Sequence, residues 1–183
     1  MEESKLIKDL KSANTKNTAF KKLVSLYKER LYWHIRKFVK LHEDADDILQ
    51  NTFIKIFNNI SNFNENAKLY TWMYRIATNE AINHLKKEAK LQYTDIDTIL
   101  LDNVNKLDTD SYYNGTEIAY KLQQSIAKLP YKQQLVFNMK YFENLKYAEI
   151  SEILETSIGA LKASYHLAVK KIKKDIVTIN HYE

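Results

Sequence analysis

Apolar residues recur at three- and four-residue steps along most of the chain, and this period predicts helices. The clearest helix begins at Asp44, where one face carries Ala45, Ile48, Leu49, Phe53, Ile56, Phe57 and Ile60. Similar spacing predicts helices over residues 20–39 and 69–90 and a short helix over 6–10, whereas the polar stretch 61–68 predicts a loop. We therefore expect an N-terminal helical domain over residues 1–90.

The second half of the chain shows a break in this period and then its return. Residues 91–115 lose the helical spacing, gain Asp and Asn and end at Gly115, so we interpret them as a linker. Helical spacing resumes at about Thr116 and stops at Pro130. Further helices are predicted over 132–141 and on both sides of a hinge at Glu155-Thr156-Ser157. Residues 116–183 are therefore expected to form a second helical domain.

Composition favours an all-α fold, with two helical domains joined by a flexible acidic linker. The 183 residues include two glycines and one proline, which leaves little material for hairpin turns. Without cysteine, the chain has neither a disulfide framework nor a thiolate metal site. No apolar run approaches the roughly 20 residues of a membrane span, and the charged start MEESKLIKDLK is unlike a signal peptide. We expect a cytoplasmic protein that does not insert into a membrane.

The formal net charge of +5 is distributed in blocks. Residues 20–90 carry 13 Lys or Arg against eight acids, and residues 118–183 carry ten Lys against six acids. Between them, residues 91–117 carry one Lys against six acids. A basic surface attracts polyanions through counterion release, so nucleic acid is the natural partner. Charge alone is equally compatible with ordinary solvated helix faces.

The last pair of predicted helices has the pattern of a helix-turn-helix. Ile150, Ile153 and Leu154 can pack against Ile158, Leu161, Tyr165 and Ala168 of the second helix. Its outward face then carries small, hydrogen-bonding and cationic side chains suited to a major groove, namely Ala160, Lys162, Ala163, Ser164, His166 and Lys170. Ser157 is placed as the N-cap, where backbone N–H groups can meet a phosphate. The alternative is a simple helical hairpin in a bundle.

A second polar face runs along the predicted helix over 69–90. Arg75, Asn79, Asn83, Lys86 and Lys90 follow one another at steps of four, four, three and four, which puts all five on one side. Asn amides can pair with base edges and the cations can neutralise phosphates. Nearby, Phe63, Tyr70, Trp72 and Tyr74 offer aromatic faces for unpaired bases. The alternative is that Phe63 and Trp72 belong to the core and that the polar face is merely solvated, and for Trp72 we favour the core.

Acidic residues gather at the start of the helix that begins near Asp44. The segment His42-Glu43-Asp44-Ala45-Asp46-Asp47 continues with Gln50 on the face opposite the apolar stripe. Acids in the first turn of a helix are expected simply because they complement its dipole. No His or carboxylate set has the spacing of metal ligands, so we expect no metal site. The other interpretation of this acidic cluster is a surface that docks on another protein.

Three segments together resemble the extracytoplasmic-function (ECF) class of bacterial RNA polymerase sigma factors. DADDILQNTFIKIF resembles the part of region two that docks on the polymerase clamp, and TWMYRIATNEAINHL resembles the helix that melts the promoter and reads the minus-ten element. LPYKQQLVFNMKYFENLKYAEISEIL followed by SIGALKASYHLAVKKIK resembles region four, which reads the minus-thirty-five element. The likeness covers nearly the whole chain and keeps the three segments in order.

The resemblance implies roles for particular residues. Asp44, Asp47 and Gln50 fall where the family contacts core polymerase, together with Phe53, which we expect in the core. Phe63, Ile76 and Asn79 fall where the family holds a flipped minus-ten base, beside Arg75, Asn83 and Lys86 of the same helix. Ser157, Lys162, Ser164, His166 and Lys170 are expected at the minus-thirty-five element. The resemblance implies core RNA polymerase, promoter DNA and an anti-sigma factor as partners, a monomer when free, no cofactor and no enzymatic activity.

Several positions depart from the family pattern. Glu155 stands where the turn often has glycine, Ala160 replaces a frequent threonine, and Leu167 and Val169 stand where arginine is frequent. Fewer cations mean fewer phosphate contacts, so weaker or differently tuned minus-thirty-five binding is expected. The rival interpretation is a helix-turn-helix regulator that binds duplex DNA without polymerase. An enzyme acting on nucleic acid is disfavoured, because the chain lacks a phosphate loop, a metal cluster and a paired nucleophile and base.

Overall fold

The structure is a computed structural model that describes residues 2–39, 41–105 and 117–179. All regular secondary structure in these ranges is helical. The chain divides into two compact units, Met1–His84 and Leu85–Glu183. None of the helices in the described ranges is long and apolar enough to cross a membrane.

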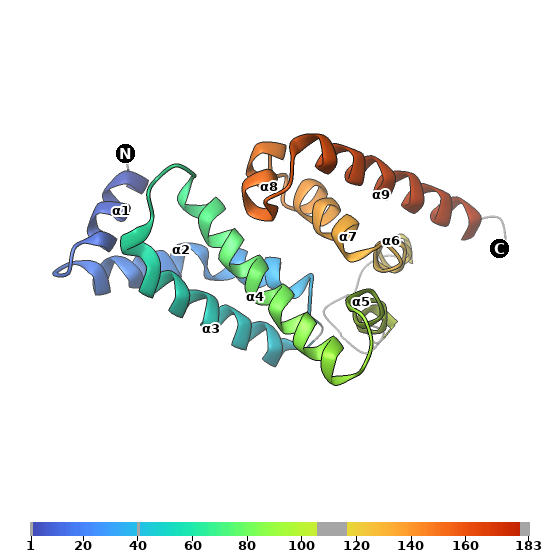
Figure 1. The fold of residues 1–183 in the computed structure, drawn as a ribbon, viewed down its shortest axis with the longest axis horizontal. Coiled ribbons are helices and arrows are strands. Elements are labelled where there is room, and N and C mark those ends of the chain that lie inside the picture. The colour runs from blue at the N-terminus through green and yellow to red at the C-terminus, as the bar shows by residue number, and fades with distance from the viewer. Residues whose placement is uncertain (1, 40, 106–116, 180–183) are drawn as a thin grey trace. The chain divides into compact units, whose positions relative to one another are not determined.

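The first unit contains α1 (Glu2–Lys11), α2 (Lys16–Arg36), α3 (His42–Asn59), the short 3-10 helix η1 (Ile60–Asn62) and most of α4 (Leu69–Leu91). Helix α3 runs alongside α2, and α1 packs on α2 and η1 (Figure 1). The core is built from the apolar stripes of these helices, with Leu10, Leu23, Leu31, Ile35, Ile56, Ile60, Leu69 and Met73 fully buried. All four helices predicted for this half of the chain are found.

A buried hydrogen bond joins α2 to α4. His34 is 1% exposed, and its Nε2 lies 2.8 Å from the Thr78 hydroxyl. That hydroxyl donates its own proton to the Tyr74 carbonyl at 2.8 Å. Because the proton of Thr78 is used in this way, Nε2 of His34 must carry a proton and donate it to Thr78. The pair fixes the position of α4 against α2 at the residue next to Asn79.

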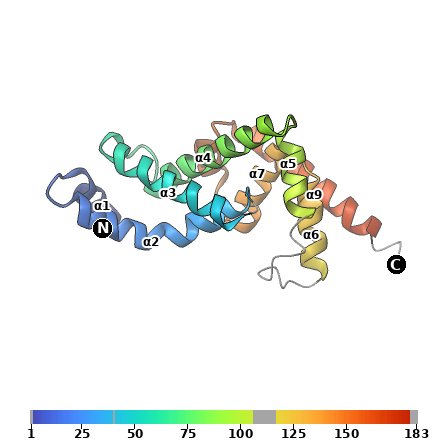
Figure 2. The same cartoon turned by 90° about the horizontal axis from the view of Figure 1, so that it is seen from below.

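The second unit contains α5 (Ile96–Asn105), α6 (Glu117–Ala127), α7 (Tyr131–Phe137), the π-helix η4 (Asn138–Phe142), α8 (Tyr147–Leu154) and α9 (Ile158–Ile179). Helix α9 packs on α6, α7 and α8 (Figure 1; seen from below in Figure 2). One cluster of its core consists of Ile126, Leu129, Phe137, Ala168 and Ile172. The single helix predicted over 132–141 is found as α7, which continues directly into the π-helix.

Helix α5 corrects the prediction that residues 91–115 have no helical structure. Asp95 caps it, since its carboxylate accepts the Thr98 N–H at 2.8 Å, and this hydrogen bond lowers the pKa of Asp95. Ile99 and Leu100 are buried, and α5 packs on α6 and α7. Ile96, Ile99 and Leu100 have the spacing of a helix, but the Asp and Asn residues around them are typical of a polar linker.

Helix α5 also completes the start of α7. The N-cap of α7 is Pro130, which has no side-chain acceptor, and the Tyr131 N–H instead donates to Oδ1 of Asp97 at 2.5 Å. A carboxylate at a helix N-terminus is favoured by the helix dipole. The remainder of the predicted linker, 106–115, lies outside the described residues.

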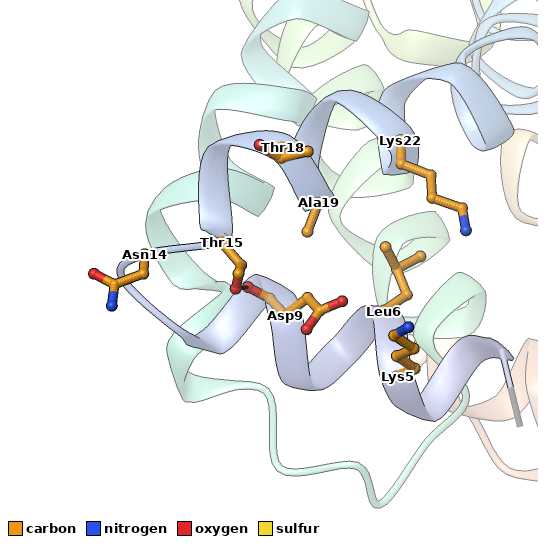
Figure 3. Close-up of a pocket in the computed structure, with 8 residues that line it drawn as sticks. All are labelled: Lys5, Leu6, Asp9, Asn14, Thr15, Thr18, Ala19 and Lys22. Carbon is orange, nitrogen blue, oxygen red and sulfur yellow. Dashed lines mark hydrogen bonds between the residues drawn. The ribbon is translucent and has the colours of Figure 1, made fainter.

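A pocket of about 430 Å³ lies in the angle between α1 and α2 (Figure 3). Leu6 and Ala19 contribute its apolar surface, and Lys5, Asp9, Asn14, Thr15, Thr18 and Lys22 complete the lining. The hydroxyl of Thr15 donates to the Asp9 carbonyl at 2.8 Å, which ties the turn between the two helices to α1. Its lining has mixed charge, and none of the residues singled out from the sequence lies here.

Candidate nucleic-acid interface

The turn between α8 and α9 is held by local hydrogen bonds. Glu155 ends α8 in the left-handed region, at φ 51° and ψ 41°. The Ser151 hydroxyl donates to the Thr156 carbonyl at 2.7 Å. The Ser157 hydroxyl accepts the Ala160 N–H at 3.3 Å, which confirms Ser157 as the N-cap of α9. The predicted hinge is therefore a three-residue turn that fixes the direction in which α9 leaves α8.

Helix α9 buries one side and exposes the other. Leu161, Ala168 and Ile172 are buried. The residues predicted for the outward face are exposed at Ala160, Lys162, Ala163, His166 and Lys170 and half-buried at Ser164. Ile158, expected against α8, is 42% exposed, because the first residue of a helix has neighbouring turns on one side only. The arrangement presents a cationic face with small side chains that let a ligand approach the helix backbone closely.

Replacing Glu155 with glycine is expected to stabilise the protein by about 0.5–1 kcal/mol, because the left-handed conformation costs an L-residue energy that glycine avoids. Thermal unfolding followed by circular dichroism measures this effect. The matched control is Glu152→Gly, which places glycine at an exposed position inside α8 and should destabilise by about 1 kcal/mol. A lower unfolding midpoint for Glu155→Gly would mean that the Glu155 side chain contributes more than its backbone costs.

The polar face of α4 has the geometry predicted from its spacing. Arg75, Asn79, Asn83, Lys86 and Lys90 are all exposed. The opposite side of the helix is buried at Met73, Ala77, Ala81 and Leu85, and Ile76 is half-buried between the two sides. Next to Asn79, Glu80 accepts a hydrogen bond from Lys55 of α3 at 2.5 Å. Amide and cationic side chains therefore lie on one exposed side of a helix whose other side is buried.

Phe63 lies in the core of the first unit. It is 3% exposed, and its ring centroid is 5.2 Å from that of Trp72, itself half-buried. The ammonium of Lys11 lies 5.8 Å from the same centroid. Phe63 thus has the position expected of a core residue, whereas Trp72, expected in the core, is only half-buried. Of the three residues implied for base capture, only Asn79 is exposed.

The acidic face of α3 leaves two of its three implied contact residues open to solvent. Asp47 and Gln50 are exposed, whereas Asp44 is half-buried with its carboxylate 3.8 Å from Nε2 of His84. Phe53, expected in the core, is half-buried and packs edge-on against Phe20, with ring centroids 6.1 Å apart. In the described part of the chain, no three His, Cys, Asp or Glu side chains are grouped to hold a metal ion.

One group near α9 was not singled out from the sequence. The ammonium groups of Lys140, from η4, and Lys162, from α9, lie 5.2 and 5.9 Å from the ring centroid of Tyr147 in α8. Spacing along the chain carries no signal for such a group, because its members meet only through the packing of three elements. The sequence signal for this group is limited to the basic and aromatic residues within 140–147.

Comparison with known proteins identifies the family. The sequence matches the models of sigma-70 region 2 over residues 23–91 and of sigma-70 region 4 over residues 120–172. It is 32% identical to the ECF RNA polymerase sigma factor SigW of Bacillus subtilis, over 94% of this chain and 95% of that protein. The chain belongs to the ECF class of RNA polymerase sigma factors. This ECF sigma factor is therefore a DNA-binding protein of transcription initiation, and a stand-alone helix-turn-helix regulator is not favoured.

Two solved structures share the fold of this ECF sigma factor. One is CnrH in complex with the cytosolic domain of CnrY, with a TM-score of 0.68 at 18% identity over 96% of this chain and 97% of that one. The other is the sigma factor RpoE in complex with the anti-sigma factor NepR from Bartonella quintana. It has a TM-score of 0.65 at 17% identity, over 86% of this chain and 96% of that one.

Proposed function

We propose that this ECF sigma factor binds core RNA polymerase through α3, reads and opens the minus-ten element with α4, and reads the minus-thirty-five element with α9. The observation that carries the proposal is that α4 and α9 each expose a polar, cationic side opposite a buried apolar one, within the segments that match regions 2 and 4. Region two then covers 1–90 and region four 116–183, with 91–115 between them.

The α4 face suits single-stranded DNA at the minus-ten element. The Asn79 and Asn83 amides each offer a donor and an acceptor to a base edge, and Arg75 and Lys86 can neutralise phosphates. Ile76, half-buried beside Asn79, offers an apolar surface to a base that has left the stack. Because Phe63 is buried, we assign base capture chiefly to Asn79 and Ile76.

The α9 face suits duplex DNA at the minus-thirty-five element. Ser164 and His166 can hydrogen-bond to base edges, and Lys162 and Lys170 carry positive charge toward the backbone. Ser157 and the first N–H groups of α9 can receive a phosphate at the helix N-terminus. The exposed Leu167, 46% accessible, stands where a cation would add another phosphate contact, which supports the expected weaker binding.

Charge reversal at Asp47 tests the docking surface on α3. Asp47→Lys is expected to lower the affinity for core RNA polymerase about tenfold or more, because it replaces an exposed carboxylate of the proposed docking surface with a cation. Competition with a labelled sigma factor for core polymerase measures the loss. The matched control is Glu29→Lys, the same charge change on an exposed position of α2. Equal losses in the two variants would reduce the effect to net charge and remove Asp47 from the docking surface.

The remaining parts of the proposal concern partners and setting. The Bartonella quintana neighbour was solved with an anti-sigma factor, and we infer that this chain is likewise held by an anti-sigma factor until it is released to polymerase. It acts in the cytoplasm, where its polymerase and promoters are, and is a monomer when free. It contributes binding rather than catalysis and needs no cofactor of its own.

A further inference from the structure

The connecting segment, residues 63–68, joins η1 to α4 and is held at one end by Lys11, the last residue of α1. The Lys11 ammonium lies 2.7 Å from a carboxylate oxygen of Glu65 and 5.8 Å from the ring centroid of Phe63. The backbone of Glu65 is in the left-handed region, at φ 62°, which costs an L-residue energy. Such a conformation persists where surrounding contacts hold it. Lys11 therefore supports the connecting segment at a strained residue.

Glu3, in the first turn of α1, holds the other end of the connecting segment. Its Oε1 accepts the Leu69 N–H, at the start of α4, at 3.3 Å. Lys68, the residue before α4, has no acceptor in its side chain, so this carboxylate takes the place of a local cap. Leu6 and Leu10 of α1 are buried. Helix α1 is thus fixed in the core of the first unit and carries a contact to each end of the connecting segment.

The connecting segment borders the side of α4 that is proposed to hold a base. The ring of Phe63 packs on that of Trp72, with centroids 5.2 Å apart. Trp72, Ile76 and Asn79 follow one another at steps of four and three, which places them along one side of α4. Trp72 and Ile76 are half-buried, and Asn79 is exposed. A shift of the connecting segment would therefore change the surroundings of a base bound at Asn79 and Ile76.

We propose that the ion pair between Lys11 and Glu65 positions the connecting segment for the capture of a minus-ten base at Asn79. This inference rests on the function proposed for α4. Lys11 and Glu65 are positioning residues, which act on the base through the connecting segment. Helix α1 precedes residues 23–91, the part of the chain that matches sigma-70 region 2. A helix outside the matched residues then sets how firmly the minus-ten base is held.

The ion pair suits a positioning role better than a structural one. The side chains of Lys11 and Glu65 are 31% and 50% exposed, and ion pairs this open to water contribute little to stability. Without the pair, the connecting segment relaxes in the free protein, and returning it to its place on binding costs the energy that the pair supplied. Loss of the pair should therefore weaken DNA binding while the thermal unfolding of the full chain stays close to that of the wild type.

The test uses holoenzyme assembled from core polymerase and the full chain. It is titrated with a labelled single strand that carries the minus-ten element, and with versions of that strand that each lack one base. The captured base is the one whose removal weakens binding by the wild type but not by Asn79→Ala. Lys11→Gln is expected to weaken binding of the intact strand about twofold to fivefold, the range that an exposed ion pair can supply. Binding of the strand without the captured base should be unchanged.

Three further variants isolate the ion pair. Lys11→Arg keeps the charge and should retain the affinity for the intact strand. Glu65→Gln should show the same loss as Lys11→Gln, and the double variant should lose no more than either single one, because both remove one interaction. The matched control is Lys8→Gln, which removes the same charge from an exposed position of α1 and should affect both strands equally and weakly.

The proposal is overturned if Lys11→Gln behaves like Lys8→Gln, if it weakens both strands equally, or if the losses of Lys11→Gln and Glu65→Gln add. It is also overturned if the loss follows a lower unfolding midpoint or a lower affinity for core polymerase. A different result tests the function proposed for α4. If the removal of no base distinguishes the wild type from Asn79→Ala, base capture at Asn79 is wrong, whatever Lys11 does.

Discussion

Asn79→Ala is expected to reduce open-complex formation at cognate promoters about tenfold or more while leaving the affinity for core RNA polymerase unchanged. A paired base contact contributes about 1–3 kcal/mol, and about 1.4 kcal/mol corresponds to a factor of ten. Asn79 is exposed on the polar side of α4, whereas the proposed docking residues lie on α3. Truncating its amide therefore removes a DNA contact without disturbing packing. Permanganate reactivity of unpaired thymines measures opening, and competition for core polymerase measures docking.

The matched control is Asn58→Ala, which removes the same amide from an exposed position of α3. It should leave opening and polymerase affinity near the wild-type values. If Asn79→Ala lost polymerase affinity in proportion to opening, the polar side of α4 would be a polymerase contact and its assignment to DNA would be wrong. If neither quantity changed, base capture would lie elsewhere in region two.

Leu161→Ala is expected to destabilise the second unit by about 2–5 kcal/mol, the usual effect of emptying a well-packed leucine site. Leu161 is 1% exposed on the side of α9 that faces the other helices. The lost side chain leaves a cavity that α8 and α9 cannot fill without moving relative to each other. Chemical denaturation followed by far-ultraviolet circular dichroism measures the change in the free energy of unfolding.

Leu167→Ala provides the comparison on the same helix. Leu167 is 46% exposed, so its truncation should change the free energy of unfolding by no more than about 0.5 kcal/mol. Similar losses in the two variants would contradict the assignment of buried and exposed sides of α9. The same pair separates stability from function, because Leu167→Ala should leave minus-thirty-five binding in place.

The amphipathic period predicted which side of each long helix is buried. In α4 it placed Asn79 and Asn83 on the outward side, as the structure has them. It could do so because one turn of 3.6 residues fixes the direction of every side chain once the helix is known. The turn at Glu155 was also predictable, since its polar residues interrupt two apolar stripes.

Contacts between distant parts of the chain could not be predicted in this way. The carboxylate of Asp97 accepts a hydrogen bond from the Tyr131 N–H, 34 residues further along the chain. No local sequence pattern predicts this contact. Phe63 lies in a polar segment, and the sequence does not determine whether its ring is buried or exposed. Its burial results from packing against Trp72 in the folded protein. Tyr147 meets Lys140 and Lys162 only because η4, α8 and α9 pack together. Each of these features depends on tertiary structure.

The buried hydrogen bond between His34 and Thr78 bears on how tightly α4 can hold DNA. Asn79 follows Thr78 directly, so its backbone is one peptide away from a point fixed on two sides, by Tyr74 within the helix and by His34 from α2. Because the backbone at Asn79 is already immobile, it would lose little conformational entropy on binding a base. Most of the interaction energy would then be retained as affinity. Under the function proposed for α4, this internal histidine would contribute to promoter recognition by preorganising the helix that carries Asn79.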